Sequence, residues 1–376
     1  MSRSVDLIVI GCGAVGGAAA WRAAERGLSV RGFDRFAPPH DRGSSHGQTR
    51  LTRLSYFEHP DHVPLLLRSF DLWAELEAGS GRRVYHETGL LEIGPEDGVV
   101  VPGVLKSAAE HGLAVEKMTE DDFRREHPGF RLPEGSSVVH EAKAGCLLVE
   151  DAVGAQLELA RRGGAEIVTN EEIVGWSADG DGVVVETSSG LHRAGGLVVS
   201  AGAWASDSVA GLGVDLRVVE KHLHWFSVDG DGHRLASGSP CFLHERPEGL
   251  FYGFPDVDGT GVKVAEHSGG RELADPSERR PVPDPDDDAR VLRYVEDCLS
   301  GVSARRTRHV TCLYTMSPDE LFIVDRHPLH EQVALAAGLS GHGFKFAPVL
   351  GEVLVDLAMT GQSEQPIEFL GLSRFS

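Results

Sequence analysis

A strand, a glycine-rich turn and a helix open the chain, and this start constrains the fold more than any other stretch. An apolar run at residues 5–10 leads into the turn, and an alanine-rich segment follows it. The turn consists of Gly11, Cys12, Gly13, Ala14, Val15 and Gly16. Gly11 permits a tight turn, Gly13 lets backbone approach a pyrophosphate, and Gly16 lets helix and sheet pack closely. The spacing predicts a Rossmann-like dinucleotide-binding unit with phosphates at the helix N-terminus.

Asp34 supports this interpretation. It ends a second apolar run at residues 30–33 and lies 23 residues after Gly11. An acid at this distance accepts ribose hydroxyls and repels a 2′-phosphate. Strand, helix and acid together supply the context that the glycine motif alone lacks. The cofactor-binding residues predicted from this opening are Gly11, Gly13, Ala14, Val15, Gly16, Asp34 and Arg35.

Length and charge limit the other possibilities. A chain of 376 residues exceeds the roughly 250 to 300 at which single cores usually divide, so we expect two domains. A net charge of −21 disfavours nucleic acids and anionic membranes as partners. The five cysteines are widely spaced without a CxxC pair, which indicates neither a disulfide framework nor a metal site. Without a signal peptide or a run of ~18 apolar residues, we expect a cytoplasmic protein.

Changes in hydrophobic periodicity divide the chain into two alternating parts. Residues 83–145 and 216–317 are rich in short runs of period two, typical of an antiparallel sheet. Residues 146–215 and 318–376 return to strands followed by small-residue turns and helices. We therefore predict an α/β (α+β) two-domain fold. A discontinuous dinucleotide-binding domain would comprise residues 1–82, 146–215 and 318–376, and a mainly antiparallel domain would comprise the rest.

Cations cluster after the second strand. Residues 43–50 combine small residues with charges, which suits a ligand loop, although a solvated connection is the more ordinary interpretation. Arg50 and Arg53 are three residues apart, so they would share a face if this segment enters a helical turn. Two cations near one site could bind a carboxylate.

Two further stretches allow two interpretations each, and two others have one. Lys263 and His267 lie on one face of a predicted strand, which is either functional or solvent-exposed. Cys312 is either a small buried hydrophobe or a reactive thiol. A strand, glycine turn and helix around residues 338–346 could place a helix N-terminus beside a redox ring. The acidic, proline-rich residues 275–288 predict an exposed connection.

Six stretches together resemble the monomeric sarcosine oxidase and N-methyltryptophan oxidase family of flavoproteins, in the same order and from end to end. They are GCGAVG with Asp34, GSSHGQTRLTR, SAGAW, FYGFP followed by GVKVAEH, TCLYT, and GLSGHGFKF. The resemblance implies a discontinuous FAD-binding domain, a substrate domain on a mainly antiparallel sheet, and the flavin at their junction. It also implies FAD bound covalently through the sulfur of Cys312.

The resemblance assigns roles by position. Arg53 and Lys345 resemble the pair that holds the substrate carboxylate, and Lys263 resembles the oxygen-activating residue near the flavin N5. The implied catalytic set is Lys263, Arg50, Thr49, His267 and Tyr314. The implied lining of the amine end of the substrate pocket is Tyr252, His267 and Tyr314. Further implied cofactor contacts are Ser44, His46, Thr49, Arg50, Gly202, Trp204, Cys312, Gly341, Gly343, Phe344 and Lys345.

The expected activity is that of an FAD-dependent amine oxidase. It would oxidise the C–N bond of a secondary amino acid to an imine and reduce O₂ to hydrogen peroxide, acting as a monomer. One alternative is a flavin-dependent dehydrogenase, and another is a tailoring enzyme for a cyclic amine such as pipecolate. An NAD-binding dehydrogenase or a noncatalytic nucleotide-binding protein would need only the N-terminal motif. Residues 243–245 do not identify a specificity set, so the substrate's size stays open.

Overall fold

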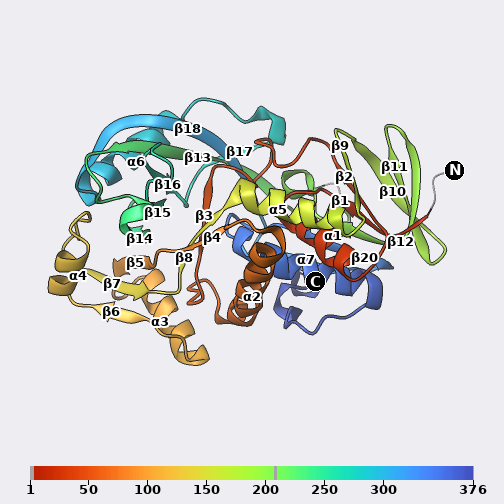
Figure 1. Cartoon of the computed structure of the whole chain (residues 1–376), viewed down its shortest axis with the longest axis horizontal. Helices are drawn as coiled ribbons and strands as arrows, with labels where there is room; N and C mark the ends of the chain where they lie inside the picture. Colours follow the sequence, from red (N-terminus) through yellow and green to blue (C-terminus); the bar gives the residue numbers. More distant parts are fainter. Residues whose placement is uncertain (1–3, 207–209, 376) are drawn as a thin grey trace.

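The structure, a computed structural model, describes residues 4–206 and 210–375. Within these residues the strands form three sheets. Figure 1 shows the two larger sheets toward opposite ends of the long axis, with the small sheet and helix α2 (Val63–Ser80) between them. The chain passes several times between these two ends.

An eight-stranded sheet, here called the Rossmann-like sheet, contains the N-terminal strand. Its order is β10-β11-β12-β1-β2-β9, with β20 beside β12 and β19 beside β20. The bounds are β1 (Val5–Ile10), β2 (Val30–Asp34), β9 (Glu166–Thr169), β10 (Ile173–Asp179), β11 (Gly182–Thr187), β12 (Gly190–Val199), β19 (Ile323–His327) and β20 (His330–Ala337). From β9 to β20 the neighbouring central strands run parallel, and the central strands β1, β12 and β20 contain the apolar runs typical of buried parallel strands.

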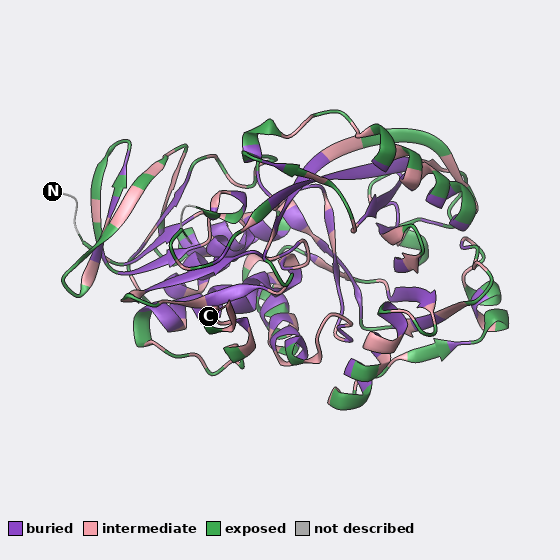
Figure 2. Cartoon of the chain, turned by 180° about the vertical axis from the view of Figure 1, so that it is seen from behind, coloured by how far each residue is buried: buried purple, intermediate pink, exposed green. Residues whose placement is uncertain are grey.

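Three helices pack together beside the Rossmann-like sheet: α1 (Ala14–Glu25), α5 (Val149–Arg162) and α7 (Ala347–Thr360). Helix α1 lies between the other two. Its many alanines and glycines are buried, and their small size lets the neighbouring helices and strands approach α1 closely. In Figure 2 buried residues concentrate in these helices and sheets, whereas the hairpin β10–β11 is largely exposed or half-buried.

A nine-stranded sheet, here called the antiparallel sheet, forms the other end of the molecule. Its order is β17-β13-β16-β15-β14-β5-β7-β6, with β18 beside β13. The bounds are β5 (Leu90–Pro95), β6 (Glu116–Met118), β7 (Ser136–Glu141), β13 (Arg217–Val228), β14 (Cys241–Arg246), β15 (Gly249–Phe254), β16 (Val262–Glu266), β17 (Arg271–Leu273) and β18 (Val302–Met316). Its neighbours are antiparallel except β14 and β5. The helices of this end are α3 (Val100–His111), α4 (Glu120–Glu126) and α6 (Pro285–Cys298).

A small antiparallel sheet lies between the two ends. It pairs β3 (Thr49–Thr52) with β8 (Gly145–Leu148), and β8 with β4 (Tyr85–Glu87). Strand β3 carries Arg50 into the middle of the molecule, and Arg53 follows at its end.

The predicted fold class is confirmed: a Rossmann-like α/β part is joined to a second part built on a mainly antiparallel sheet. The exact domain ranges stay a proposal. Strands β5 to β7 from residues 83–145 join the antiparallel sheet, and β19 and β20 from residues 318–376 join the Rossmann-like sheet, which supports that division. Residues 1–3, 207–209 and 376 of the proposed ranges lie outside the described residues.

The condition attached to one local expectation is not met, and another expectation is wrong in part. Arg50 and Arg53 do not share the face of a helical turn, because residues 49–52 form strand β3. Residues 275–288 are not wholly an exposed connection, because α6 begins at Pro285 and Asp287 is buried. The Asp284 carboxylate accepts hydrogen bonds from the first turn of α6, a capping interaction that favours helix initiation.

Among the described residues, no helix is long and apolar enough to cross a membrane.

Candidate cofactor and substrate site

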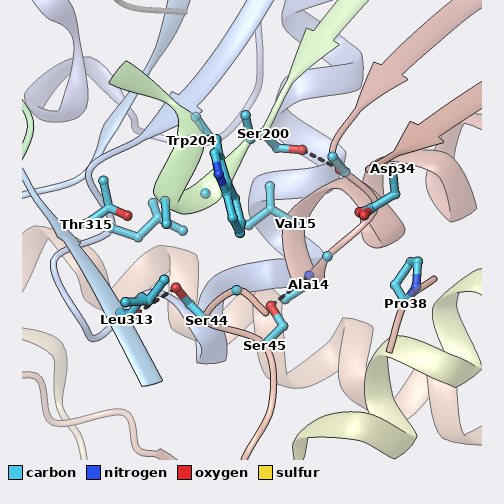
Figure 3. Close-up of a pocket in the computed structure, with 18 of the residues that line it drawn as sticks. Ala14, Val15, Asp34, Pro38, Ser44, Ser45, Ser200, Trp204, Leu313 and Thr315 are labelled. Atoms are coloured by element: carbon cyan, nitrogen blue, oxygen red, sulfur yellow. Dashed lines mark hydrogen bonds between the residues drawn. The ribbon is translucent and has the colours of Figure 1, made fainter. Parts of the chain in front are cut away.

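A cavity of about 530 Å³ lies where β1, β2, β12 and β20 end. The carboxyl ends of parallel strands are the usual place for a ligand in such a sheet. From there the cavity reaches residues 312–315 of β18 in the antiparallel sheet. Figure 3 shows Asp34 on one side, Leu313 and Thr315 on the other, and the Trp204 indole between them. The cavity therefore spans the junction of the two parts.

Two glycines of the N-terminal turn, Gly11 and Gly16, have the predicted mechanical roles. Gly11 has a φ of 82°, and a Cβ there would lie 2.5 Å from the Ser200 carbonyl oxygen. A Cβ on Gly16 would lie 1.8 Å from the Gly11 carbonyl oxygen, so only glycine lets α1 approach the strand this closely. The turn thus places Gly13 and Ala14, at the N-terminus of α1, on the cavity wall.

The Asp34 carboxylate is fixed by backbone groups. It accepts hydrogen bonds from the Cys12 N–H and the Phe36 N–H, each at 2.8 Å. His40 Nε2 lies 3.3 Å from Asp34 Oδ1. These contacts hold the carboxylate at the cavity wall, where it can accept ribose hydroxyls.

The loop at residues 43–50 is a cavity wall rather than a solvated connection. Ser45 Oγ accepts from the Ala14 N–H at 3.2 Å, and Ser44 Oγ donates to the Leu313 carbonyl at 2.7 Å (Figure 3). The loop therefore joins α1 to β18 across the cavity. Gly43, Ser44, Ser45 and Arg50 line it.

Arg50 and Cys312 form a close pair on the wall of this cavity. Arg50 Nη2 lies 3.3 Å from Cys312 Sγ and donates to the Ser44 carbonyl at 2.9 Å. Burial opposes ionisation of the thiol, but the Arg50 cation and His46 outweigh burial and lower the pKa of Cys312 to about 6. Cys312 is thus buried, as one interpretation predicted, and also has the lowered pKa of a reactive thiol.

Lys263 is buried, so the interpretation of its strand face as solvent-exposed is wrong. Its Nζ donates to the carbonyls of Gly47 at 2.7 Å and Thr49 at 2.8 Å. The rings of Phe254 and Trp225 lie 4.7 and 5.4 Å from Nζ, which favours a cation there. Burial and the nearby Arg50 cation lower the pKa of Lys263 well below its usual value. Lys263 thereby supports the loop that carries Thr49 and Arg50.

A second cavity of about 50 Å³ adjoins the first. Four residues line both cavities: Arg50, Tyr314, Gly341 and Phe344. The remaining walls of the smaller cavity are Leu51, Arg53, Phe57, Glu58, Leu243, Leu250, Tyr252, His267, His342 and Lys345. The two cavities are therefore parts of one site.

Arg53 is a buried cation held between two carboxyl groups. Its Nη2 donates to both Glu58 oxygens, at 2.6 and 2.8 Å, and its Nε lies 3.4 Å from Glu92 Oε1. Burial favours neutral Glu58, but Arg53 and Lys345 outweigh burial and lower its pKa. Burial raises the pKa of Glu92 well above the usual range despite the opposing effect of Arg53. Glu58 is therefore the anionic partner, and Glu92 favours its neutral form.

Lys345 lies in the short 3₁₀ turn that precedes α7. Its Nζ donates to the His342 carbonyl at 2.9 Å. Burial and the Arg53 cation lower the pKa of Lys345 to about 7, against the opposing effect of Glu58. Arg53 and Lys345 thus approach the smaller cavity from elements almost three hundred residues apart in sequence.

Another part of the smaller cavity's wall is neutral and aromatic. Tyr314 O–H lies 3.2 Å from His267 Nδ1 and 3.4 Å from Tyr252 O–H. Burial, with the nearby His342, lowers the pKa of His267 to about 3, so its imidazole is neutral at pH 7. Burial raises the pKa values of both tyrosines, so they keep their protons.

Most residues predicted as cofactor contacts line the larger cavity. They are Gly11, Gly13, Ala14, Val15, Asp34, Arg35, Ser44, Arg50, Gly202, Trp204, Cys312, Gly341, Gly343 and Phe344. Lys345 lies on the smaller cavity, as do all predicted substrate-binding residues. In the described part of the chain, neither wall includes Gly16, His46, Thr49 or Lys263.

Sequence reasoning did not find Glu58 or Glu92 in the site. Glu58 follows Arg53 closely in sequence, but Glu92 reaches Arg53 from strand β5 of the antiparallel sheet. Glu92 is a single acid within an apolar run of period two. Because Asp and Glu are almost never fully buried without a partner, this was the available indication that Glu92 has a buried partner.

Across the described residues, no cluster of histidine, cysteine and acidic side chains suits a metal ion.

Comparisons with known proteins identify the class. A family model described as FAD dependent oxidoreductase (DAO) matches residues 6–357. A monomeric sarcosine oxidase of Streptomyces avermitilis is 40% identical over 372 residues, covering 98% of this chain and 97% of the relative. An N-methyl-L-tryptophan oxidase of Salmonella typhimurium is 37% identical over 373 residues, covering 99% of each.

A solved structure also matches almost the whole chain. It is NikD, described as an unusual amino acid oxidase essential for nikkomycin biosynthesis, with a TM-score of 0.85, 27% identity and 98% of both chains covered. The chain belongs to the FAD dependent oxidoreductase family, and within it resembles the sarcosine and N-methyltryptophan oxidases as its sequence predicted. It is an FAD-dependent oxidoreductase.

Proposed function

We propose that this protein is an oxidase of small secondary amino acids of the sarcosine or N-methyl amino acid type. It would oxidise the C–N bond to an imine and reduce O₂ to hydrogen peroxide. The observation that carries the proposal is the convergence of Arg53 and Lys345 on a small cavity that shares a wall with the larger one. The names of the two relatives point to the same substrate class.

The residues that line the larger cavity suit FAD. Asp34 would accept ribose hydroxyls, and the N-terminus of α1 would face the pyrophosphate. FAD, when bound, supplies the acceptor for the substrate's electrons and their transfer to O₂. We further propose covalent attachment through Cys312 Sγ. This thiol is buried on the wall beside Arg50, and a pKa of about 6 makes it largely thiolate at pH 7.

The smaller cavity separates the two ends of an amino acid. Arg53 and Lys345 would bind its carboxylate, while Tyr252, His267 and Tyr314 would surround its amine. Oxidation of the C–N bond needs the nitrogen lone pair, so the amine must be neutral when it reacts. An imidazole with a pKa of about 3 and two protonated tyrosines offer no anion that would stabilise an ammonium. The cations thus position the substrate without acid–base work.

Lys263 would act on oxygen. Reduction of O₂ develops negative charge, and a cation already in place stabilises that charge without reorganisation. The two carbonyls that accept from Nζ and the two aromatic rings beside it offset part of the cost of burying an ammonium.

The size of the smaller cavity points to a compact substrate. A volume of about 50 Å³ walled by Phe57, Leu243 and Leu250 suits an N-methyl group and a short side chain better than an indole. We therefore expect sarcosine, N-methylalanine or proline to be oxidised in preference to N-methyltryptophan.

A substrate panel tests the proposal directly. Purified holoenzyme in air-saturated buffer should release hydrogen peroxide with sarcosine, and far less with N-methyltryptophan. Flavin bleaching by sarcosine without peroxide in air would instead indicate a dehydrogenase. Absence of both with every secondary amino acid in the panel would contradict the proposed substrate class.

A further inference from the structure

Both proposed carboxylate-binding cations lie over one aromatic ring. Arg53 Cζ lies 4.6 Å from the centroid of the Tyr56 ring, and Lys345 Nζ lies 5.1 Å from the same centroid. Tyr56 is fully buried and lines neither cavity in the described part of the chain. It therefore acts on the site through its neighbours, which include the two cations and His342.

The Tyr56 hydroxyl continues this arrangement to His342. His342 Nε2 lies 3.0 Å from the Glu320 carbonyl, which can only accept, so Nε2 carries the ring proton. Burial and Lys345 lower the pKa of His342 to about 3, so the ring is neutral and its Nδ1 is an acceptor. The Tyr56 O–H hence donates to His342 Nδ1.

The backbone of His342 contacts Lys345. Its carbonyl accepts from Lys345 Nζ at 2.9 Å, so one residue orients the Tyr56 ring and also holds the ammonium. Tyr56 is in turn anchored by its own carbonyl, which accepts from Ser107 Oγ. The ring packs edge-on against Phe346 at 5.3 Å. Tyr56 is thus held from several sides.

Two neighbouring cations need such support. Arg53 and Lys345 repel each other in a buried site, and the pKa of Lys345 is lowered partly for this reason. The negative face of an aromatic ring attracts a cation. A single ring beneath both can therefore keep them charged and close together, whereas Glu58 neutralises only Arg53 by direct hydrogen bonds.

We propose that Tyr56 and His342 are positioning residues that hold Arg53 and Lys345 in the arrangement that binds the substrate carboxylate. This inference rests on the proposed function, because it assumes that these two cations bind a carboxylate. In this role the Tyr56 ring and hydroxyl, and the His342 ring and carbonyl, act on the two cations and need not contact the substrate.

The test compares a carboxylate with its neutral amide. Binding of propionate and propionamide to holoenzyme is measured by calorimetry for the wild type, Tyr56→Leu, Tyr56→Phe and His342→Gln. We expect the propionate Kd to rise about tenfold in Tyr56→Leu, which loses the ring, and about threefold in the other two. Propionamide affinity should stay within twofold, because the defect concerns charge. Tyr85→Phe is the matched control, since its hydroxyl donates to the Lys143 carbonyl away from both cavities.

Two results would overturn the inference. One is a propionate Kd within twofold of wild type in all folded variants, and the other is an equal loss of propionate and propionamide binding. If Tyr56→Leu does not fold, Tyr56→Phe and His342→Gln still decide the question. Arg53→Met separates this failure from that of the proposed function: if it leaves propionate affinity unchanged, the carboxylate site itself is wrong.

Discussion

Asp34 in the larger cavity is held by two backbone N–H groups, whereas Arg53 in the smaller cavity is held between two carboxyl side chains. The first arrangement follows from the local path of the chain after β1 and β2. The second requires strand β5 of the antiparallel sheet to meet the segment that follows β3. A cofactor site can thus be prepared by backbone geometry, while the substrate site depends on charges brought together by the whole fold.

A second comparison concerns the thiol pKa values of two cysteine–arginine pairs. Arg50 Nη2 lies 3.3 Å from Cys312 Sγ, and Arg246 Nη1 lies 3.1 Å from Cys298 Sγ. Arg50 and His46 overcome burial and lower the pKa of Cys312 to about 6, whereas burial prevails at Cys298 and raises its pKa to about 11. Proximity to an arginine alone does not make a thiolate.

The largest expected effect distinguishes these two thiols. In Cys312→Ser, acid precipitation should release all FAD into the supernatant, because the proposed sulfur link is absent. The matched control Cys298→Ser should keep FAD in the pellet as the wild type does. The absorption spectrum of each fraction provides the measurement. Flavin retained in the pellet of Cys312→Ser would place the attachment elsewhere.

Lys263→Met tests whether Lys263, a buried residue outside the lining of both cavities as described, acts on oxygen. We expect reoxidation by O₂ to slow by about 10² to 10³, the usual cost of removing a preorganised charge-stabilising group. Anaerobic flavin reduction by substrate should change much less. Stopped-flow absorbance of both half-reactions measures the difference, and Lys106→Met, an exposed lysine paired with Glu110, is the control. Equal losses in both half-reactions would refute the oxygen role.

Arg53→Met tests the smaller cavity. Loss of a charged hydrogen bond should weaken propionate binding by ~1.5 to 3 kcal/mol, or roughly tenfold to more than a hundredfold in Kd. Calorimetry on holoenzyme gives the value. An unchanged Kd would mean that Arg53 interacts only with Glu58 and Glu92, and that it does not bind the substrate carboxylate.

The smallest effect concerns pH. Lys345 has a pKa lowered to about 7 and binds anions only in its protonated form. Propionate affinity should therefore be greatest below pH 7 and fall as pH rises through that value, by about tenfold if the charge is lost completely. In Lys345→Met this step should vanish. An affinity that increases with pH above 7 in the wild type would contradict the assignment.

Local spacing, without the family resemblance, predicted the larger cavity better than the smaller one, for physical reasons. The roles of Gly11 and Gly16 follow from local turn geometry, and Asp34 follows at a fixed distance. The partners of Arg53 do not follow from spacing, because Glu92 comes from strand β5 of the antiparallel sheet and the Tyr56 ring, among the described residues, lines neither cavity. Family resemblance supplied the site residues that spacing alone could not.

Two further expectations, one on a strand and one on the start of α6, illustrate the same limit. Period two predicted Lys263 and His267 on one face of a strand, but β16 ends at Glu266, and only tertiary packing shows that Lys263 is buried and that His267 lines the smaller cavity. The acidic start of α6 suggested an exposed connection, yet Asp287 is buried and accepts from His224 Nε2 at 2.8 Å. A buried acid with a distant partner cannot be told from a solvated one by composition.

The most direct test of the central claim is anaerobic flavin bleaching by sarcosine and by dimethylamine, which lacks the carboxylate, followed by mixing with O₂. We predict that sarcosine bleaches the flavin rapidly, that dimethylamine does so poorly, and that O₂ restores the colour with one hydrogen peroxide formed per flavin. Equal bleaching by the two amines would contradict carboxylate binding by Arg53 and Lys345. Failure of sarcosine and every other small secondary amino acid to bleach the flavin would contradict the proposed function itself.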